Sequence, residues 1–300
     1  MKEDNKVTKQ KPQPRIPLVF RLIRAVFPLM SRWAPDLSGR VALSIFSKPI
    51  RFKSSASEIE CRDKSWQKVI VVNGLRIMTY QWGRGDRQVL LLHGWAGRAT
   101  QFHVIIEELV AKGFRVVALD LPAHGLSEGQ TTNLLEIGPV ICAVEHEFGK
   151  FDQVITHSFG GLCALYASSV GLYLKRLVSI AIPANPNLVL DEFLGKINAL
   201  PITKEAMLKR VEQLFGVSFL DFGGCQMAGK SAEFPMLIVH DEHDRESSFE
   251  HARALLLVKP DAELVATKGL GHNRILRDRQ VIVGIIEWMS RQEAATVEMA

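Results

Sequence analysis

Four segments of the sequence carry residues that could do chemistry, and each of them comes directly after a short apolar run. They are His93-Gly94-Trp95, Thr156-His157-Ser158-Phe159-Gly160-Gly161, His240-Asp241-Glu242-His243-Asp244 and Gly269-Leu270-Gly271-His272-Asn273. Serine, carboxylate and histidine side chains are the parts of a nucleophilic site. In such a site the histidine takes the serine proton and the carboxylate orients the histidine. The sequence therefore predicts a covalent mechanism built on one residue from each of three of these segments.

Ser158 lies in the pattern of a sharp strand-to-helix turn. It follows the apolar run 154–156 and precedes a helical stretch at 162–170, and the small residues after it would let strand and helix approach closely. The usual motif is Gly-x-Ser-x-Gly, and Thr156 stands here in the first glycine position, which adds bulk where the chain turns. The alternative is that Ser158 only caps the following helix, because serine is favoured there.

Two aspartates of the segment 240–244 are candidates for the orienting carboxylate. We favour Asp244 over Asp241 because it lies further into the loop, as in the usual triad arrangement. The dense His/Asp/Glu cluster also raises the possibility of a metal site. Neighbouring residues along one loop rarely point at one centre, so we expect no metal. His272 lies in a glycine-rich loop, where a core role is hard to see, and is the expected general base.

Acyl transfer also needs amide donors aimed at the negative oxygen of the intermediate. The backbone N–H groups of Trp95 and Phe159 are the candidates for this oxyanion hole. Gly94 and Gly97 would let the first loop approach the substrate. His93 is expected to be structural.

The elements that must position these residues follow a regular alternation. The apolar runs are 69–72, 75–82, 89–92, 115–119, 154–156, 177–182, 236–239 and 264–267, the first two joined by Asn73-Gly74 as a hairpin. The runs that follow the hairpin are almost entirely apolar, so we expect these strands to be buried on both faces of a sheet. Helix-length segments lie between them at 101–112, 134–148 and 162–170, which is the β-α-β pattern of a parallel sheet.

One interval, about 184–233, breaks this alternation and is too long for a plain loop. Its apolar spacing suggests helices, so we expect a cap over the strand ends. Leu190, Phe193 and Leu214 are expected to contact an apolar acyl group. The equal alternative is that they only seal the cap onto the sheet.

Residues 1–66 are expected to form a basic amphipathic arm ahead of a domain over 67–300. Residues 1–53 hold 12 Lys and Arg but only 3 Asp and Glu. Residues 1–15 are polar enough to be unstructured. Residues 18–33 have the spacing of a mostly apolar helix with a thin stripe of arginines. The stretch 16–33 either contacts an anionic membrane surface or packs on the domain or on a second subunit.

The stretch from Gln88 to His272 resembles α/β-hydrolases of the single-domain esterase and lipase-like kind. The resemblance covers most of residues 67–292. Besides the four segments it includes Asp120-Leu121-Pro122-Ala123-His124-Gly125-Leu126-Ser127, and the order Ser158, Asp244, His272 is that of the family. It implies an α/β-hydrolase fold, with a mostly parallel eight-stranded sheet, helices on both faces and a small helical cap.

The same resemblance implies a serine hydrolase that cleaves a carboxylic ester through an acyl-enzyme. Thioester cleavage, acyl transfer and carbon–carbon bond hydrolysis stay open, because the same triad serves them all. A non-catalytic binding module on the same fold also stays open. The chemistry requires no cofactor, and the expected partner is a small apolar acyl substrate.

Composition limits the other classes of function. The net charge of +5 comes from the arm, which has no interleaved aromatic platform, so a nucleic-acid partner is not expected. No apolar run reaches the roughly 18 to 20 residues of a membrane span. The four cysteines form no C-x-x-C pair, which fits neither a zinc site nor a disulfide framework and favours a reducing cytoplasm.

Overall fold

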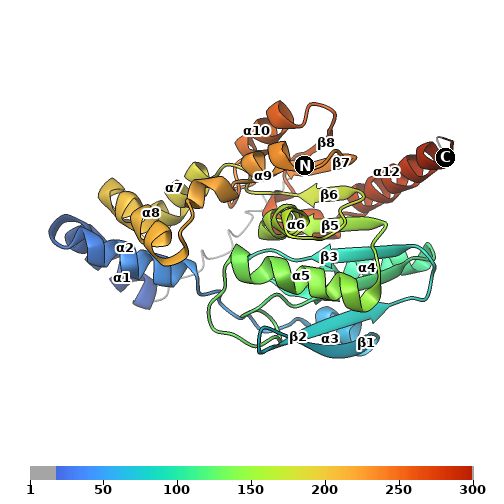
Figure 1. Cartoon of the computed structure of the whole chain (residues 1–300), viewed down its shortest axis with the longest axis horizontal. Coiled ribbons are helices and arrows are strands. Elements are labelled where there is room, and N and C mark those ends of the chain that lie inside the picture. Colours follow the sequence, from blue (N-terminus) through green and yellow to red (C-terminus); the bar gives the residue numbers. More distant parts are fainter. Residues whose placement is uncertain (1–17, 299–300) are drawn as a thin grey trace, which may run out of the picture.

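A computed structural model describes residues 18–298 (Figure 1). Residues 1–15, which are expected to be unstructured, and residues 16 and 17 of the expected arm lie outside this range. The described chain contains one eight-stranded sheet of order β1-β2-β4-β3-β5-β6-β7-β8. The strands are β1 (Trp66–Val72), β2 (Leu75–Trp82), β3 (Gln88–Leu92), β4 (Arg115–Leu119), β5 (Gln153–His157), β6 (Leu177–Ile180), β7 (Met236–Asp241) and β8 (Glu263–Thr267).

The sheet is parallel from β4 to β8, and only β2 runs against it, because β2 pairs antiparallel with both β1 and β4. In that hairpin Val72 pairs with Leu75, and Asn73 and Gly74 have φ angles of 50° and 80°. Two successive residues with positive φ are what a tight two-residue hairpin turn requires. The expected fold class, an eight-stranded mostly parallel sheet, is confirmed.

Helices cover both faces of the sheet, and each face has its own apolar core. One core includes side chains of α5 (Leu134–Phe148), α6 (Phe159–Ser169), α9 (Gly224–Lys230) and α10 (Glu250–Val258). The other includes side chains of α3 (Ala56–Asp63), η1 (Ala99–Phe102), α4 (His103–Ala111), η3 (Ile275–Arg277) and α12 (Arg279–Glu298). The short helix α11 (Gly271–Arg274) carries His272.

Strand β8 differs from the expectation of burial on both faces. Glu263, Val265 and Ala266 are exposed, and Leu264 and Thr267 are only half-buried. The reason is position, because β8 is an edge strand that pairs with β7 alone and the helices cover it incompletely. Apolar content alone does not distinguish an edge strand from a central one.

The interval 184–233 contains helices and no strand in the described structure. These are α7 (Pro186–Lys196), α8 (Pro201–Phe215), the 3-10 turn η2 (Phe219–Phe222) and α9. Figure 1 shows α7 and α8 beside the first two helices of the chain, α1 (Leu18–Trp33) and α2 (Pro35–Phe46), in a lobe next to the sheet. We refer to α7, α8 and η2 as the cap.

The arm packs on the cap through close backbone contact. The hydroxyls of Ser31 and Ser38 both hydrogen-bond to Oγ1 of Thr203, at 2.8 and 2.9 Å. A Cβ on Gly39 would lie 2.6 Å from the carbonyl carbon of Ala206, so α2 and α8 meet at a distance that only glycine permits. The inner face of α1 therefore contacts the same chain, as one of the two interpretations expects.

None of the described helices is both long enough and apolar enough to cross a membrane.

Substituting Gly39 by alanine should destabilise the protein although alanine is the better helix former. The new methyl group must push α2 from α8, which we expect to lower the free energy of unfolding by about 1–3 kcal/mol. The matched control is Gly229→Ala, because a Cβ there meets nothing within 4 Å. That change should be neutral or stabilise by up to about 1 kcal/mol. Urea unfolding measures both, and equal effects would contradict the close contact.

Candidate active site

Ser158 lies at the sharp turn between β5 and α6. Its φ and ψ angles are 51° and −123°, a strained conformation for a residue with a side chain. Ser158 stands at the N-cap position of α6, but its side chain makes no capping hydrogen bond there. A Cβ on Gly160 would overlap the carbonyl oxygen of Leu92, which explains why a glycine must follow.

Thr156 occupies the first glycine position of the motif without disturbing the turn. It is fully buried within β5, and its Oγ1 lies 3.2 Å from the carbonyl oxygen of Val178 and 3.2 Å from Oγ of Ser179 on β6. The extra bulk therefore packs against the neighbouring strand.

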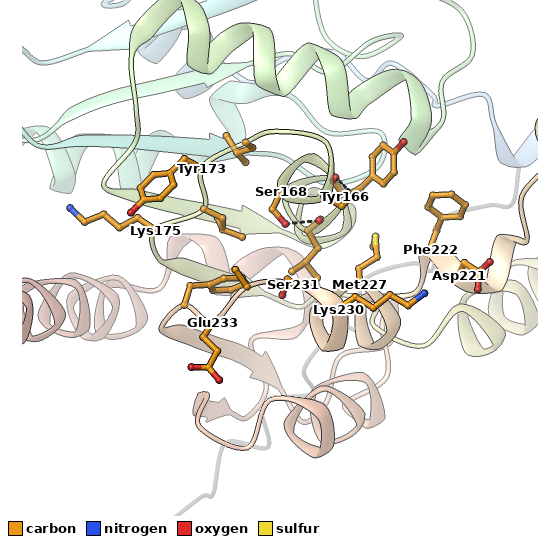
Figure 2. Close-up of a pocket in the computed structure, with 16 residues that line it drawn as sticks. Tyr166, Ser168, Tyr173, Lys175, Asp221, Phe222, Met227, Lys230, Ser231 and Glu233 are labelled. Carbon is orange, nitrogen blue, oxygen red and sulfur yellow. Dashed lines mark hydrogen bonds between the residues drawn. The ribbon is translucent and has the colours of Figure 1, made fainter.

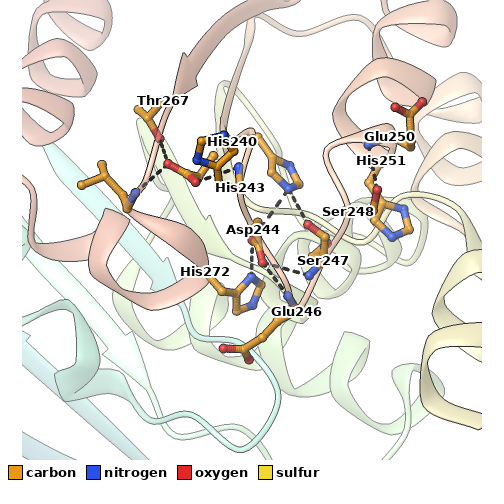
Figure 3. A network of polar contacts seen from close by, with 12 residues as sticks. His240, His243, Asp244, Glu246, Ser247, Ser248, Glu250, His251, Thr267 and His272 are labelled. Carbon is orange, nitrogen blue, oxygen red and sulfur yellow. Dashed lines mark hydrogen bonds and ion pairs between the residues drawn. The ribbon is translucent and has the colours of Figure 1, made fainter. Parts of the chain in front are cut away.

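Asp244 and His272 meet across two loops at the ends of β7 and β8 (Figure 3). Nδ1 of His272 lies 2.7 Å from Oδ2 of Asp244, and Oδ1 of Asp244 accepts the amides of Glu246 and Ser247. Burial would raise the pKa of Asp244, but the hydrogen bond and charge of His272 outweigh it and lower the pKa. An ionised carboxylate at Nδ1 holds the proton there and leaves Nε2 free to accept one.

Asp241 has a different task from Asp244, because it holds the histidine loop by its backbone. Its carboxylate accepts hydrogen bonds from the hydroxyl of Thr267 at 2.8 Å and from the amides of Gly269 and Leu270 at 3.2 and 2.9 Å. Burial would raise the pKa of Asp241, but these donors outweigh it and lower the pKa to about 2. Of the two candidate aspartates, the structure brings Asp244 to His272.

Ser158 and His272 line the same polar hollow, of about 490 Å³. Among the described residues no hydrogen bond joins the hydroxyl of Ser158 to the ring of His272. Nucleophile–base contacts often tighten only when substrate is bound. The structure thus brings together Asp244 and His272 directly, and Ser158 and His272 as two walls of one cavity.

The loop after β3 approaches the nucleophile closely. A Cβ on Gly94 would lie 3.0 Å from Cβ of Ser158. The amides of Trp95 and Phe159 find no acceptor in the part of the chain that the structure describes. Two unpaired donors beside the serine hydroxyl are what an oxyanion hole needs.

His93 is structural, as expected. Its Nε2 accepts the amide of Leu121 at 3.0 Å, so its Nδ1 carries the proton and donates to the carbonyl oxygen of Gly94 at 2.8 Å. Burial lowers the pKa of His93 to about 4, which keeps the ring neutral.

His157 contributes a contact that the sequence did not indicate. Its Nε2 donates to the backbone carbonyl of His272 at 2.9 Å, and the two rings lie 4.7 Å apart. Burial lowers the pKa of His157 to about 3, so the ring is neutral. The residue before the nucleophile is an unspecified position of the motif, which is why only the structure reveals that it fixes the histidine loop.

A second, mainly apolar hollow of about 240 Å³ also has Ser158 in its wall. Its wall includes Phe46 of the arm, whose ring lies 6.3 Å from that of Trp95 and 5.0 Å from that of Phe193. The cap, the arm and the sheet therefore all contribute to this cavity. The arm's share in it was not expected from the sequence.

Of the three expected acyl contacts, only Phe193 lines this hollow. Leu190 is wholly buried in the core between arm and cap and does not line the hollow. Leu214 is 49% exposed on α8 and does not line the hollow either. Leu190 and Phe193 are three positions apart and lie on the same general face of α7, so helical spacing alone does not show which of them reaches the hollow.

A further cavity, of about 460 Å³, lies at the other end of α6, between Tyr166, Tyr173 and Phe222 (Figure 2). It contains no residue of the four chemical segments.

Comparison with known proteins agrees with this geometry. The sequence model of the alpha/beta hydrolase family matches residues 89–284, and the chain therefore belongs to this family. A serine hydrolase-like protein of Dictyostelium discoideum is 30% identical over 36% of this chain and 32% of its own length. A pimeloyl-acyl-carrier-protein methyl ester esterase of Xanthomonas campestris is 34% identical over 34% of this chain and 38% of its own length. The matches thus span about a third of these curated relatives.

Solved structures share the fold at low identity. Est1E of Butyrivibrio proteoclasticus, solved with ferulic acid bound, has a TM-score of 0.59 and 21% identity, over 76% of this chain and 99% of its own. An esterase of Pyrococcus furiosus has a TM-score of 0.58 and 19% identity, over 83% of this chain and 96% of its own. At this identity the likeness concerns the fold.

Substituting Asp241 by asparagine should make the protein less stable in a pH-dependent way. The folded pKa lies below the ordinary 3.8, so the ionised carboxylate stabilises the fold above that value. This stabilisation is lost as the pH falls through about 2. The advantage of wild type over Asp241→Asn should shrink by about 2 kcal/mol across this window, as measured by urea unfolding. A difference that does not change with pH would contradict the assigned role.

Proposed function

We propose that this protein is a serine esterase in which Ser158, His272 and Asp244 form the catalytic triad. The observation that carries the proposal is the position of Ser158, strained and uncapped, on the wall of the same hollow as the Asp244–His272 pair. The two unpaired amides beside it and the order of the three residues along the chain add support. Several relatives are named methylesterases or methyl ester esterases, which favours carboxylic esters as the substrate class.

In the proposed mechanism Nε2 of His272 takes the proton of Ser158 as the serine oxygen attacks the acyl carbon. Asp244 stabilises the imidazolium that forms. The amides of Trp95 and Phe159 bind the oxyanion, at about 3 kcal/mol for one such donor. Collapse of this intermediate expels the alcohol, which takes the proton from His272. Water activated by the same ring then attacks the acyl-enzyme and releases the acid.

The two hollows suggest where each half of the ester binds. The hollow beside Phe46 and Phe193 is mainly apolar and suits the acyl group. The hollow lined by Arg98, Gln101 and Asn273 is polar and suits the alcohol. Ser158 lines both, as a nucleophile between the two halves must.

Ser158→Ala should abolish turnover of p-nitrophenyl esters by a factor on the order of a thousand or more, with the fold intact. Labelling by a fluorophosphonate probe should vanish with it. The control is Ser169→Ala, at the exposed end of the same helix, which should keep both the ester turnover and the labelling by the probe. Folded wild type that neither turns over esters nor reacts with the probe would favour a non-catalytic binding module instead.

Phe46→Ala should change the preference for acyl chain length, because it removes one wall of the apolar hollow. We expect kcat/KM for medium-chain esters to fall about tenfold while that for acetate esters changes little, since a buried aromatic side chain contributes about 1.5–3 kcal/mol. The ratio of the two rates does not depend on the fraction of folded enzyme. Phe215→Ala, on the cap but outside this hollow, is the control. An unchanged ratio would remove Phe46 from the acyl site.

A further inference from the structure

Helix α1 is apolar on two opposite sides, and only one of them is covered. Its inner side buries Phe27 against the cap. Its outer side exposes Leu18 at 78%, Leu22 at 64% and Leu29 at 62% of their surfaces, together with Trp33 at 77%. These four residues are spaced by 4, 7 and 4 positions, so they lie along one face of the helix. Val19 and Val26 are also exposed and widen it. We call these six side chains the outer face of α1.

A stable folded protein seldom leaves such a face to water. A helix that is hydrophobic all round is normally buried on all sides, and a contiguous exposed apolar patch usually marks an interaction site. Figure 1 shows α1 at the margin of the lobe, away from the sheet. No other described element packs over its outer face, because the residues that form it are exposed. The outer face therefore has the properties of a binding surface.

The charges around the outer face indicate what kind of partner it suits. Arg21 and Arg32 are exposed on α1, and residues 18–33 contain no acidic residue. Residues 1–53 hold 12 Lys and Arg against 3 Asp and Glu. Each cation near an anionic membrane surface contributes favourably to binding. Tryptophan at the end of the apolar stripe also suits the boundary between lipid and water.

A second copy of the chain is a poorer partner for the same face. In a symmetric pair each face meets itself, so two antiparallel α1 helices would bring Arg21 of one near Arg32 of the other. No acidic side chain on either helix could neutralise them. We propose that the outer face of α1 docks on the surface of an anionic lipid membrane, lying along it rather than crossing it.

The docked helix would also be tied to the rim of the candidate active site. Nη1 of Arg24 donates to the backbone carbonyl of Lys196 at 2.6 Å. Lys196, the last residue of α7, lines both hollows beside Ser158. Docking would therefore hold the site next to the membrane surface, where an apolar substrate accumulates. The docking itself does not depend on the proposed esterase activity.

The test is co-sedimentation of the full chain with vesicles of phosphatidylcholine alone and of phosphatidylcholine with phosphatidylserine. Wild type should sediment with the phosphatidylserine vesicles, and less so at high salt. The variant Leu22→Ser/Leu29→Ser should bind at least about tenfold more weakly. Arg21→Gln/Arg32→Gln should lose about fivefold for each arginine. Leu257→Ser is the matched control, because Leu257 is a leucine of α10 that is 85% exposed and should not change binding.

Circular dichroism checks that each variant is folded. We expect all of them to fold, because the substituted residues are exposed. Three results would overturn the proposal. One is wild type that sediments with neither kind of vesicle. Another is a double leucine variant that binds as well as wild type. The last is a wild-type dimer in solution that the double leucine variant abolishes, which would assign the outer face to a second copy.

Discussion

The pairing of β7 with β8 is the interaction on which the candidate site depends. It places Asp241 opposite Thr267 at the carboxyl ends of the two strands. The Asp241 carboxylate binds both the hydroxyl of Thr267 and the amides of the following loop, so it fixes the entry to the helix that carries His272. From the other side His157 holds the carbonyl of His272. The 2.7 Å contact between His272 and Asp244 is therefore the result of two independent backbone anchors.

The arm connects two properties of the molecule that its sequence suggests separately. Its second helix supplies Phe46 to the wall of the apolar hollow, and the close contact of Gly39 with α8 holds that helix on the cap. Arg51, just after it, donates to the carbonyl oxygens of Ala123, Ser127 and Gly129 in the loop after β4. The arm is thus bound to the cap and to the hydrolase sheet at once. Any partner of its outer face would act on a segment that also shapes the cavity.

The sequence predicted the sheet, the helix at 18–33 and the segments that converge, because period and order along the chain encode them locally. It did not reveal α2 and α3, or the exposure of β8, since these depend on what packs against each element. The position of Leu190 and Leu214 outside the apolar hollow was not predicted, for the same reason. An apolar side chain can equally belong to the core between arm and cap, as Leu190 does, or stand as a single exposed residue, as Leu214 does. Phe46 could not be found because it lies more than 100 positions from Ser158, and only the tertiary fold brings them together.

The central claim is that Ser158 and the His272–Asp244 pair act as one unit. A double-mutant cycle on kcat for ester hydrolysis tests it most directly, with Ser158→Ala, His272→Ala and the variant that carries both. Residues that act as a unit are strongly non-additive, so each variant should lose a similar factor, on the order of a thousandfold or more, and the double variant no more than either single one. Losses that multiply in the double variant, or a His272→Ala variant that keeps its activity, would contradict the claim.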